Sequence, residues 1–221
     1  MNKILLLLLM LCVAVIGRAQ DNAKPWVFSG GYTVGTTLAQ VRGDGIEGFN
    51  KIGFHAGGLI EVRQFSDLGF QLGLVYNQKG SRKVPNLKTG DGTDWRYQFT
   101  YVDIPLVAVY DFTEGFTVGT GLQPSVLIDA LEDGVANGGY STGTWQDTQL
   151  PIRNWELSWV VWVGMRTGKQ GEWFLRHTQS LPGIVPKPPN NTTIPARWDD
   201  RMQNLTMQLG YTRLFGGRSN S

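Results

Sequence analysis

Large apolar residues alternate with small or polar ones along most of the chain after residue 25. The first such run has Trp26, Phe28, Tyr32, Val34 and Leu38 at even positions, with small or polar residues at most of the odd positions between them. A period of two places these sets on opposite faces of an extended strand, and a helix would not keep them apart. This run therefore predicts a β-strand with one strongly apolar face.

The same alternation recurs down the chain and predicts eight strands, an even number. Pro105 interrupts the fourth strand, and since proline cannot donate to a β-ladder we expect a bulge or local irregularity there. The expected strands cover residues 26–39, 51–63, 68–80, 95–112, 116–128, 154–166, 172–181 and 201–215.

The connections between these strands alternate between long and short without exception. The short ones cover 64–67, 113–115 and 167–171, and the long ones cover 40–50, 81–94, 129–153 and 182–200. Short periplasmic turns and long outer loops in that order are typical of transmembrane β-barrels. The pattern predicts an all-β fold, an eight-stranded antiparallel up-and-down transmembrane barrel with both ends of the mature chain in the periplasm.

Aromatic residues gather at both ends of the expected strands, as in the girdles that flank the apolar band of such a barrel. The alternative is that they are ordinary core residues of a soluble β-sandwich with a periplasmic binding role. The girdle residues near the short turns and the chain ends are Trp26, Phe28, Tyr110, Phe116, Trp173, Tyr211 and Phe215, and those near the long loops are Tyr76, Tyr101 and Trp155.

The first 19 residues have the features of a secretory signal. Lys3 precedes an unbroken apolar run, 4–16, and small residues stand before an expected cleavage site after Ala19. The run is too short to span a bilayer, which needs about 20 apolar residues. Cleavage after Ala19 would remove the only cysteine, Cys12, and two of the 20 basic residues. The remaining chain would have 18 basic and 18 acidic residues. We therefore expect an exported barrel domain over 20–221 that does not bind nucleic acid, which requires a basic surplus.

The inward faces of the expected strands carry both charge signs. The lumen of an eight-stranded barrel is just wide enough for side chains to fill, so we interpret these residues as a paired, hydrogen-bonded network that blocks passage. A narrow solute channel is the alternative interpretation. The expected network contains His55, Glu61, Arg63, Asp103, Glu156, Arg166 and Arg176.

No spacing in the sequence matches a metal, nucleotide or redox site, so no cofactor is expected and no catalytic residue is assigned. His177 is the one residue that suggests an enzyme, because outer-membrane lipid A deacylases are eight-stranded barrels with a His and a Ser on their outer surface. The nearest hydroxyl candidate, Ser180, is three residues away and would face the other side of a regular strand. A barrel-surface lipid-A-modifying enzyme therefore remains an alternative function.

Several stretches resemble the PorT-like "porin family" of outer-membrane β-barrel proteins from Bacteroidetes-type bacteria. They are KIGFHAGGLIEV (51–62), LGFQLGLVYNQKGSRK (68–83), YVDIPLVAVYDF (101–112), GFTVGTGLQPSVLI (115–128) and QLGYTRLFG (208–216). The aromatic, acid and Ile-Pro-Leu of residues 101–106 look most specific, whereas His177 stands where the family would have Tyr. The resemblance implies a barrel in the bacterial outer membrane without one shared activity.

The resemblance also suggests a non-enzymatic structural or interaction role, with an accessory part in protein secretion or gliding machinery as its narrower form. The last strand is similar to the assembly signal of outer-membrane barrels through Leu209, Tyr211 and Phe215, although six residues follow Phe215. Expected partners are outer-membrane lipid, the barrel assembly machinery and, as a further option, a larger outer-membrane complex.

Overall fold

A computed structural model describes residues 26–63, 67–86, 88–113, 115–136, 139–144, 152–168, 170–185 and 202–215. The expected signal segment, 1–19, lies outside the described residues. No helix in the described part of the chain is long and apolar enough to cross a membrane.

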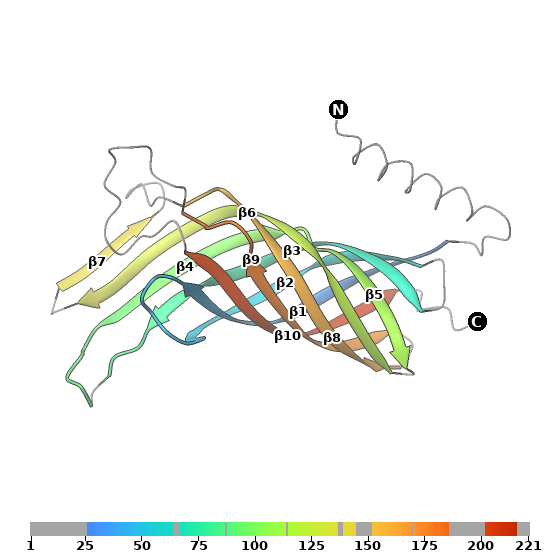
Figure 1. The fold of residues 1–221 in the computed structure, drawn as a ribbon, viewed down its shortest axis with the longest axis horizontal. Coiled ribbons are helices and arrows are strands. Elements are labelled where there is room, and N and C mark those ends of the chain that lie inside the picture. Colours follow the sequence, from blue (N-terminus) through green and yellow to red (C-terminus); the bar gives the residue numbers. More distant parts are fainter. Residues whose placement is uncertain are drawn as a thin grey trace, which may run out of the picture.

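Ten β-strands make up the described structure (Figure 1). They are β1 (Val27–Arg42), β2 (Lys51–Arg63), β3 (Leu68–Lys83), β4 (Asp94–Asp103), β5 (Leu106–Thr113), β6 (Phe116–Ala136), β7 (Gly139–Thr144), β8 (Trp155–Thr167), β9 (Gly171–Ser180) and β10 (Gln203–Phe215).

The strands form one closed antiparallel ring. Along the wall β1 pairs with β2, β2 with β3, β6 with β8, β8 with β9 and β9 with β10. β1 closes the ring against β10, from Gly30 opposite Phe215 to Arg42 opposite Gln203. β4 and β5 both lie between β3 and β6, so together they occupy one position. β7 pairs only with the end of β6. The ring therefore has eight positions, as the alternation predicts.

The irregularity expected at Pro105 is confirmed. It divides the strand expected over 95–112 in two, because Ile104 and Pro105 separate β4 from β5. Pro105 has no N–H to donate, but its carbonyl accepts a hydrogen bond of 3.0 Å from the backbone N–H of Gly73 on β3. Ile104 donates its own N–H to the carbonyl of Pro124 on β6, at 2.8 Å. The break therefore interrupts the strand without opening the wall of the barrel.

The apolar face of each strand points out of the ring. Along β3, exposed and buried residues alternate strictly from Leu68 to Val75, with the leucines and Phe70 outside. On β1 and β2 the same arrangement leaves Phe28 and Ile52 each 69 % exposed. A belt of large exposed apolar side chains around a closed ring of paired strands suits a lipid environment, and it would be unstable in water.

Strands β3, β4 and β6 continue past the others at the long-loop end, and β7 extends this projection (Figure 1). The expected ends at residues 80 and 128 are therefore too early. Exposed ion pairs tie the projecting strands together: Arg82 with Asp94 at 2.8 Å, and Arg96 with Asp133 at 2.9 Å. Hydrogen bonds from Arg82 lower the pKa of Asp94 below its usual 3.8. The ion pair of Asp94 with Arg82 therefore contributes its full stability above about pH 3.8, the usual pKa of an aspartate. The contribution is lost as the pH falls through the lowered pKa of Asp94.

Gly80 lets β3 continue into the projection. Its φ of 128° is a conformation that residues with a side chain rarely adopt. A Cβ atom there would lie 2.0 Å from the carbonyl oxygen of Tyr97 on β4.

We expect Gly80→Ala to lower the free energy of unfolding by about 1–3 kcal/mol, from backbone strain and the collision with Tyr97. The midpoint of urea unfolding in lipid vesicles would measure the change. Gly92→Ala is the matched control, since Gly92 has no atom within 4 Å of its added Cβ and no positive φ. Equal midpoints for the two variants would contradict this account of Gly80.

Candidate functional site: the filled lumen

The inward side chains near the short turns form one connected set of hydrogen bonds and ion pairs, here called the turn-side network. Its members are Glu61, Arg63, Gln71, Asp111, Thr117, Arg166 and Glu172. Arg63 contacts both Glu61, at 2.5 Å, and Asp111, at 2.7 Å. Arg166 forms a second ion pair with Asp111. Two cations and three carboxylates thus share this end of the lumen.

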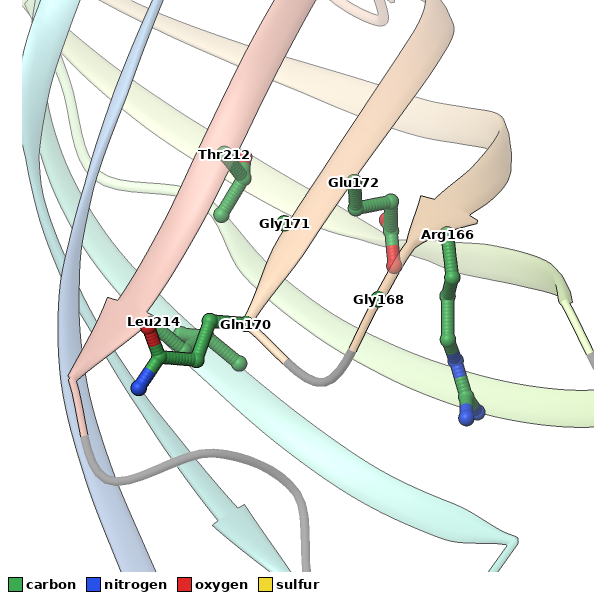
Figure 2. A pocket seen from close by; sticks show the side chains of 7 residues that line it. All are labelled: Arg166, Gly168, Gln170, Gly171, Glu172, Thr212 and Leu214. Carbon is green, nitrogen blue, oxygen red and sulfur yellow. The ribbon is translucent and has the colours of Figure 1, made fainter.

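The turn between β8 and β9 forms the edge of this network. Figure 2 shows Arg166 and Glu172 on the neighbouring strands beside that turn, next to Thr212 and Leu214 of β10. These residues line a cavity of only about 10 Å³, the space of one water molecule. Thr117 donates a hydrogen bond to Glu172 at 3.2 Å. This cavity is too small for a solute larger than a water molecule.

A second set of polar side chains, the loop-side network, is centred on Lys79. Its ammonium group is fully buried and lies 3.0 Å from an oxygen of Asp103 and 3.0 Å from an oxygen of Glu156. It also lies 4.5 Å from the centre of the Tyr101 ring, a favourable position for a cation. A buried lysine is stable only with such partners, because desolvation of an unpaired charge is very costly.

Further hydrogen bonds complete the coordination of the two carboxylates. Asn77 donates to Asp103 at 2.8 Å, and Glu156 accepts from Ser158 at 2.6 Å and from Asn204 at 2.5 Å. The loop-side network comprises Thr37, His55, Asn77, Lys79, Tyr101, Asp103, Ser125, Glu156, Ser158 and Asn204. Its residues come from almost every position of the ring, so the network ties the wall together across the lumen.

An apolar layer separates the two networks. It contains Val107, Val109, Val160 and Trp162, all buried. Gly119 on β6 makes room for it, since a Cβ atom there would lie 3.2 Å from the Trp162 ring and 3.2 Å from Val107. A larger residue at position 119 would therefore push Trp162 or Val107 out of its present position by a few tenths of an ångström.

An apolar cluster, here called the outer plug, lies beyond the loop-side network at the long-loop end of the described strands. Loop residues Ile152, Ile184 and Met202 pack there, and backbone hydrogen bonds of 2.7 Å join Ile184 to Met202 and to Arg153. The remaining members are Val41, Tyr97, Phe99, Tyr101, Leu127, Ala130 and Val185. The plug excludes water from the ion pairs beneath it.

The expected lumen residues do not form a single network. His55 and Asp103 join Glu156 in the loop-side network, whereas Glu61, Arg63 and Arg166 belong to the turn-side network. Arg176 lies between them, 3 % exposed. Arg166 is half-buried at the turn-side end.

The assignment of Tyr101 to an aromatic girdle is wrong, because the side chain is 0 % exposed and lies in the lumen. It shares the inward face with Asp103, two positions away, and Phe99 and Tyr97 follow the same parity into the plug. The other nine girdle residues lie on the outside: Trp26, Phe28, Tyr110, Phe116, Trp155, Trp173 and Phe215 are exposed, and Tyr76 and Tyr211 are half-buried.

Sequence reasoning missed Lys79, the centre of the loop-side network. The signal was present in the alternation, since Lys79 has the parity of the inward residues Gln71 and Asn77. The loop members of the plug carried no such signal, because loops have no period. No group of three or more His, Cys, Asp or Glu suited to a metal ion occurs among the described residues.

The proposed deacylase pair is not assembled. His177 is half-buried, donates a hydrogen bond from Nδ1 to the Thr206 carbonyl at 3.1 Å, and packs edge-on against the Trp159 ring. Ser180 points into the lumen, where its hydroxyl donates to the carbonyl of Asn204 at 3.2 Å. A base and a nucleophile on opposite faces of a strand cannot share a substrate.

We expect Lys79→Met to destabilise the barrel by about 3–5 kcal/mol, because it leaves two buried carboxylates without their cation. Urea unfolding in lipid vesicles would measure the loss. The matched control adds Asp103→Asn and Glu156→Gln to Lys79→Met, which removes the uncompensated charge and should restore part of the stability. A single variant as stable as the wild type would show that Lys79 does not hold these carboxylates.

Comparison with solved structures finds several proteins of low sequence identity to this chain. One of these structures is Ail, the attachment invasion locus protein of Yersinia pestis, in complex with the heparin analogue sucrose octasulfate. The two sequences are 11 % identical, the match covers 85 % of this chain and 99 % of Ail, and the TM-score is 0.48. Neisserial surface protein A is 14 % identical over 88 % of this chain and 100 % of its own, with a TM-score of 0.42. Acinetobacter baumannii CarO is 9 % identical over 83 % of this chain and 97 % of its own, with a TM-score of 0.45.

No curated protein matches the sequence. The family model described as an outer membrane protein beta-barrel domain matches residues 19–182, which is most of the chain. The chain therefore belongs to the outer membrane protein β-barrel domain family.

Proposed function

We propose that this outer-membrane barrel conducts no solute and acts as a structural or interaction protein of the cell envelope. The observation that carries the proposal is the packing of buried side chains at successive levels of the lumen, among the residues that the structure describes. The two polar networks, the apolar layer around Trp162 and the outer plug follow one another from the short turns to the outer loops. A solute would have to break buried ion pairs to pass, and each such break is costly.

The surfaces left for function are the outer wall and the projecting sheet. Family membership suggests the bacterial outer membrane, so lipid is the first partner of the apolar wall. The projection, built from β3, β4, β6 and β7, extends past the ends of the other strands (Figure 1). We propose that other molecules reach this part of the barrel first. Contact of this sheet or of the wall with a larger outer-membrane complex is the interaction that we propose.

A narrower form of the proposal is an accessory part in secretion or gliding machinery. It is supported only by the similarity of the strand motifs, such as residues 101–106, to PorT-like proteins. For assembly, we propose recognition of the last strand by the barrel assembly machinery. Leu209 and Phe215 face outward there, and Tyr211 packs against the Trp173 ring at 5.2 Å.

Planar-bilayer recording tests the proposal. We expect no steady conductance steps from the purified barrel, provided that its folding is verified by resistance to unfolding in unheated SDS. A porin of 16 strands, which encloses an aqueous channel, serves as the positive control in the same membranes. Reproducible unitary steps that scale with salt concentration would favour the solute channel and contradict the proposal.

A further inference from the structure

Two polar side chains interrupt the apolar outer face of β9. Outward residues of this strand alternate with buried ones, and Trp173 and Leu175, toward the short-turn end, are exposed. His177 and Gln179 follow on the same face and are half-buried. Leu181, one step further toward the loops, is again apolar and exposed. The two polar side chains therefore lie within the apolar band of the wall and not at its edge.

The pairing of β9 with β8 shows the depth of these residues. Gln179 stands opposite Trp159. Trp159 is four residues nearer the short turns than Trp155, the exposed aromatic at the loop end of β8. Aromatic residues at strand ends mark the membrane interface, so the Gln179 amide lies on the hydrocarbon side of that interface, and His177 lies two residues deeper. Hydrocarbon can form a hydrogen bond with neither group.

Neither side chain completes its hydrogen bonds within its own barrel. The imidazole of His177 donates from Nδ1 to the Thr206 carbonyl at 3.1 Å, which makes Nε2 of the neutral ring an acceptor. Among the described residues, no hydrogen bond involves this Nε2 or the side-chain amide of Gln179. The patch thus presents an acceptor on His177 and, on Gln179, both a carbonyl and two N–H donors.

Other polar side chains of the outer wall do bond within the barrel. On β6, Thr120 donates to the carbonyl of Val160 at 3.0 Å, and on β3 the amide of Gln78 donates to the Tyr76 hydroxyl at 3.2 Å. Polar groups inside a membrane pair in this way because an unsatisfied group in hydrocarbon is expensive. The Gln179 amide therefore requires a partner from outside the barrel that reaches the same depth.

A second copy of this chain supplies the matching groups. Two barrels inserted in the same direction meet about a two-fold axis along the membrane normal, and such an axis brings identical patches together. An amide is complementary to another amide, since each donates an N–H to the carbonyl of the other. The second N–H of each Gln179 is then available to Nε2 of His177 in the other copy.

We propose that the outer face of β8, β9 and β10 around Gln179 is the interface of a homodimer in the outer membrane. This names a partner for the wall contact proposed above and rests on that proposal. Trp159, which packs edge-on against His177 with 6.1 Å between ring centres, and the exposed Leu175 and Leu181 surround the polar centre with apolar contacts. In lipid such contacts alone give little preference for protein, so the polar pair selects which faces meet.

Disulfide cross-linking in native outer membranes tests the interface. The full chain would carry Gln179→Cys, and Gln78→Cys is the matched control, because β3 lies four strand positions from β9, on the opposite side of the ring. The wild type measures any background from Cys12. We expect Gln179→Cys to give a product of twice the chain mass that a reducing agent removes, and Gln78→Cys to give none above background. No such product, equal yields from both variants, or a cross-link to a different protein would overturn the proposal.

Dimerisation in lipid vesicles measures the contribution of the amide. Energy transfer between donor-labelled and acceptor-labelled copies would be recorded at increasing lipid-to-protein ratios, with folding verified by resistance to unheated SDS. Gln179→Leu should weaken dimerisation about tenfold, because it removes the reciprocal hydrogen bonds and keeps a side chain of similar size. Gln78→Leu should leave it unchanged.

The outcomes separate the dimer from the proposed function. No energy transfer from the wild type at any ratio, or undiminished transfer from folded Gln179→Leu, would overturn the homodimer and leave a non-conducting barrel in place. A wild type that dimerises as expected but shows unitary conductance steps would contradict the proposed function alone.

Discussion

A bilayer offers no water to satisfy backbone N–H and C=O groups, so a chain that crosses it by strands must pair every strand on both sides. In this protein the pairing of β1 with β10 meets that requirement, over thirteen residue pairs from Gly30–Phe215 to Arg42–Gln203. The pairing also continues across the break at Pro105, because the carbonyl of Pro105 and the N–H of Ile104 are hydrogen-bonded to the flanking strands β3 and β6. Once the ring is closed, strand alternation decides which side chains meet lipid and which fill the lumen.

Filling the lumen then becomes the main energetic problem. A ring of eight strand positions leaves little space inside, and charged side chains placed there must find partners or they destabilise the fold. Lys79 with Asp103 and Glu156, and Arg63 with Glu61 and Asp111, solve this at two levels. Aromatic and aliphatic side chains fill the space between and above them. The same packing that stabilises the barrel is the basis of our proposal that it conducts no solute.

Much of this architecture could be predicted from the sequence because period-two alternation carries it directly. The outward positions of Phe28, Ile60 and Phe70 follow from parity alone. Tyr101 shows where composition misleads: an aromatic near a long loop looks like a girdle residue, yet parity with Asp103 places it inside. Ile184 and Met202 could not be placed, because they reach the plug from an irregular loop whose path depends on tertiary contacts.

The extent of the projection was also not predictable from alternation. β6 continues to Ala136 through a charged stretch that resembles an ordinary loop, and cross-strand ion pairs such as Arg96–Asp133 stabilise it. The pairing of Arg176 with two rings rather than a carboxylate likewise depends on which side chains meet across the lumen. Strand parity assigns a residue to the inside of the barrel, but it does not assign its partners.

Heat modifiability of the protein in the native outer-membrane fraction would show whether it forms a closed barrel in that membrane. Unheated and boiled samples would be compared by electrophoresis in SDS. The closed, internally paired ring predicts that the unheated protein resists the detergent and migrates differently from the boiled chain. A protein found in the soluble periplasmic fraction, with the same mobility before and after boiling, would contradict it.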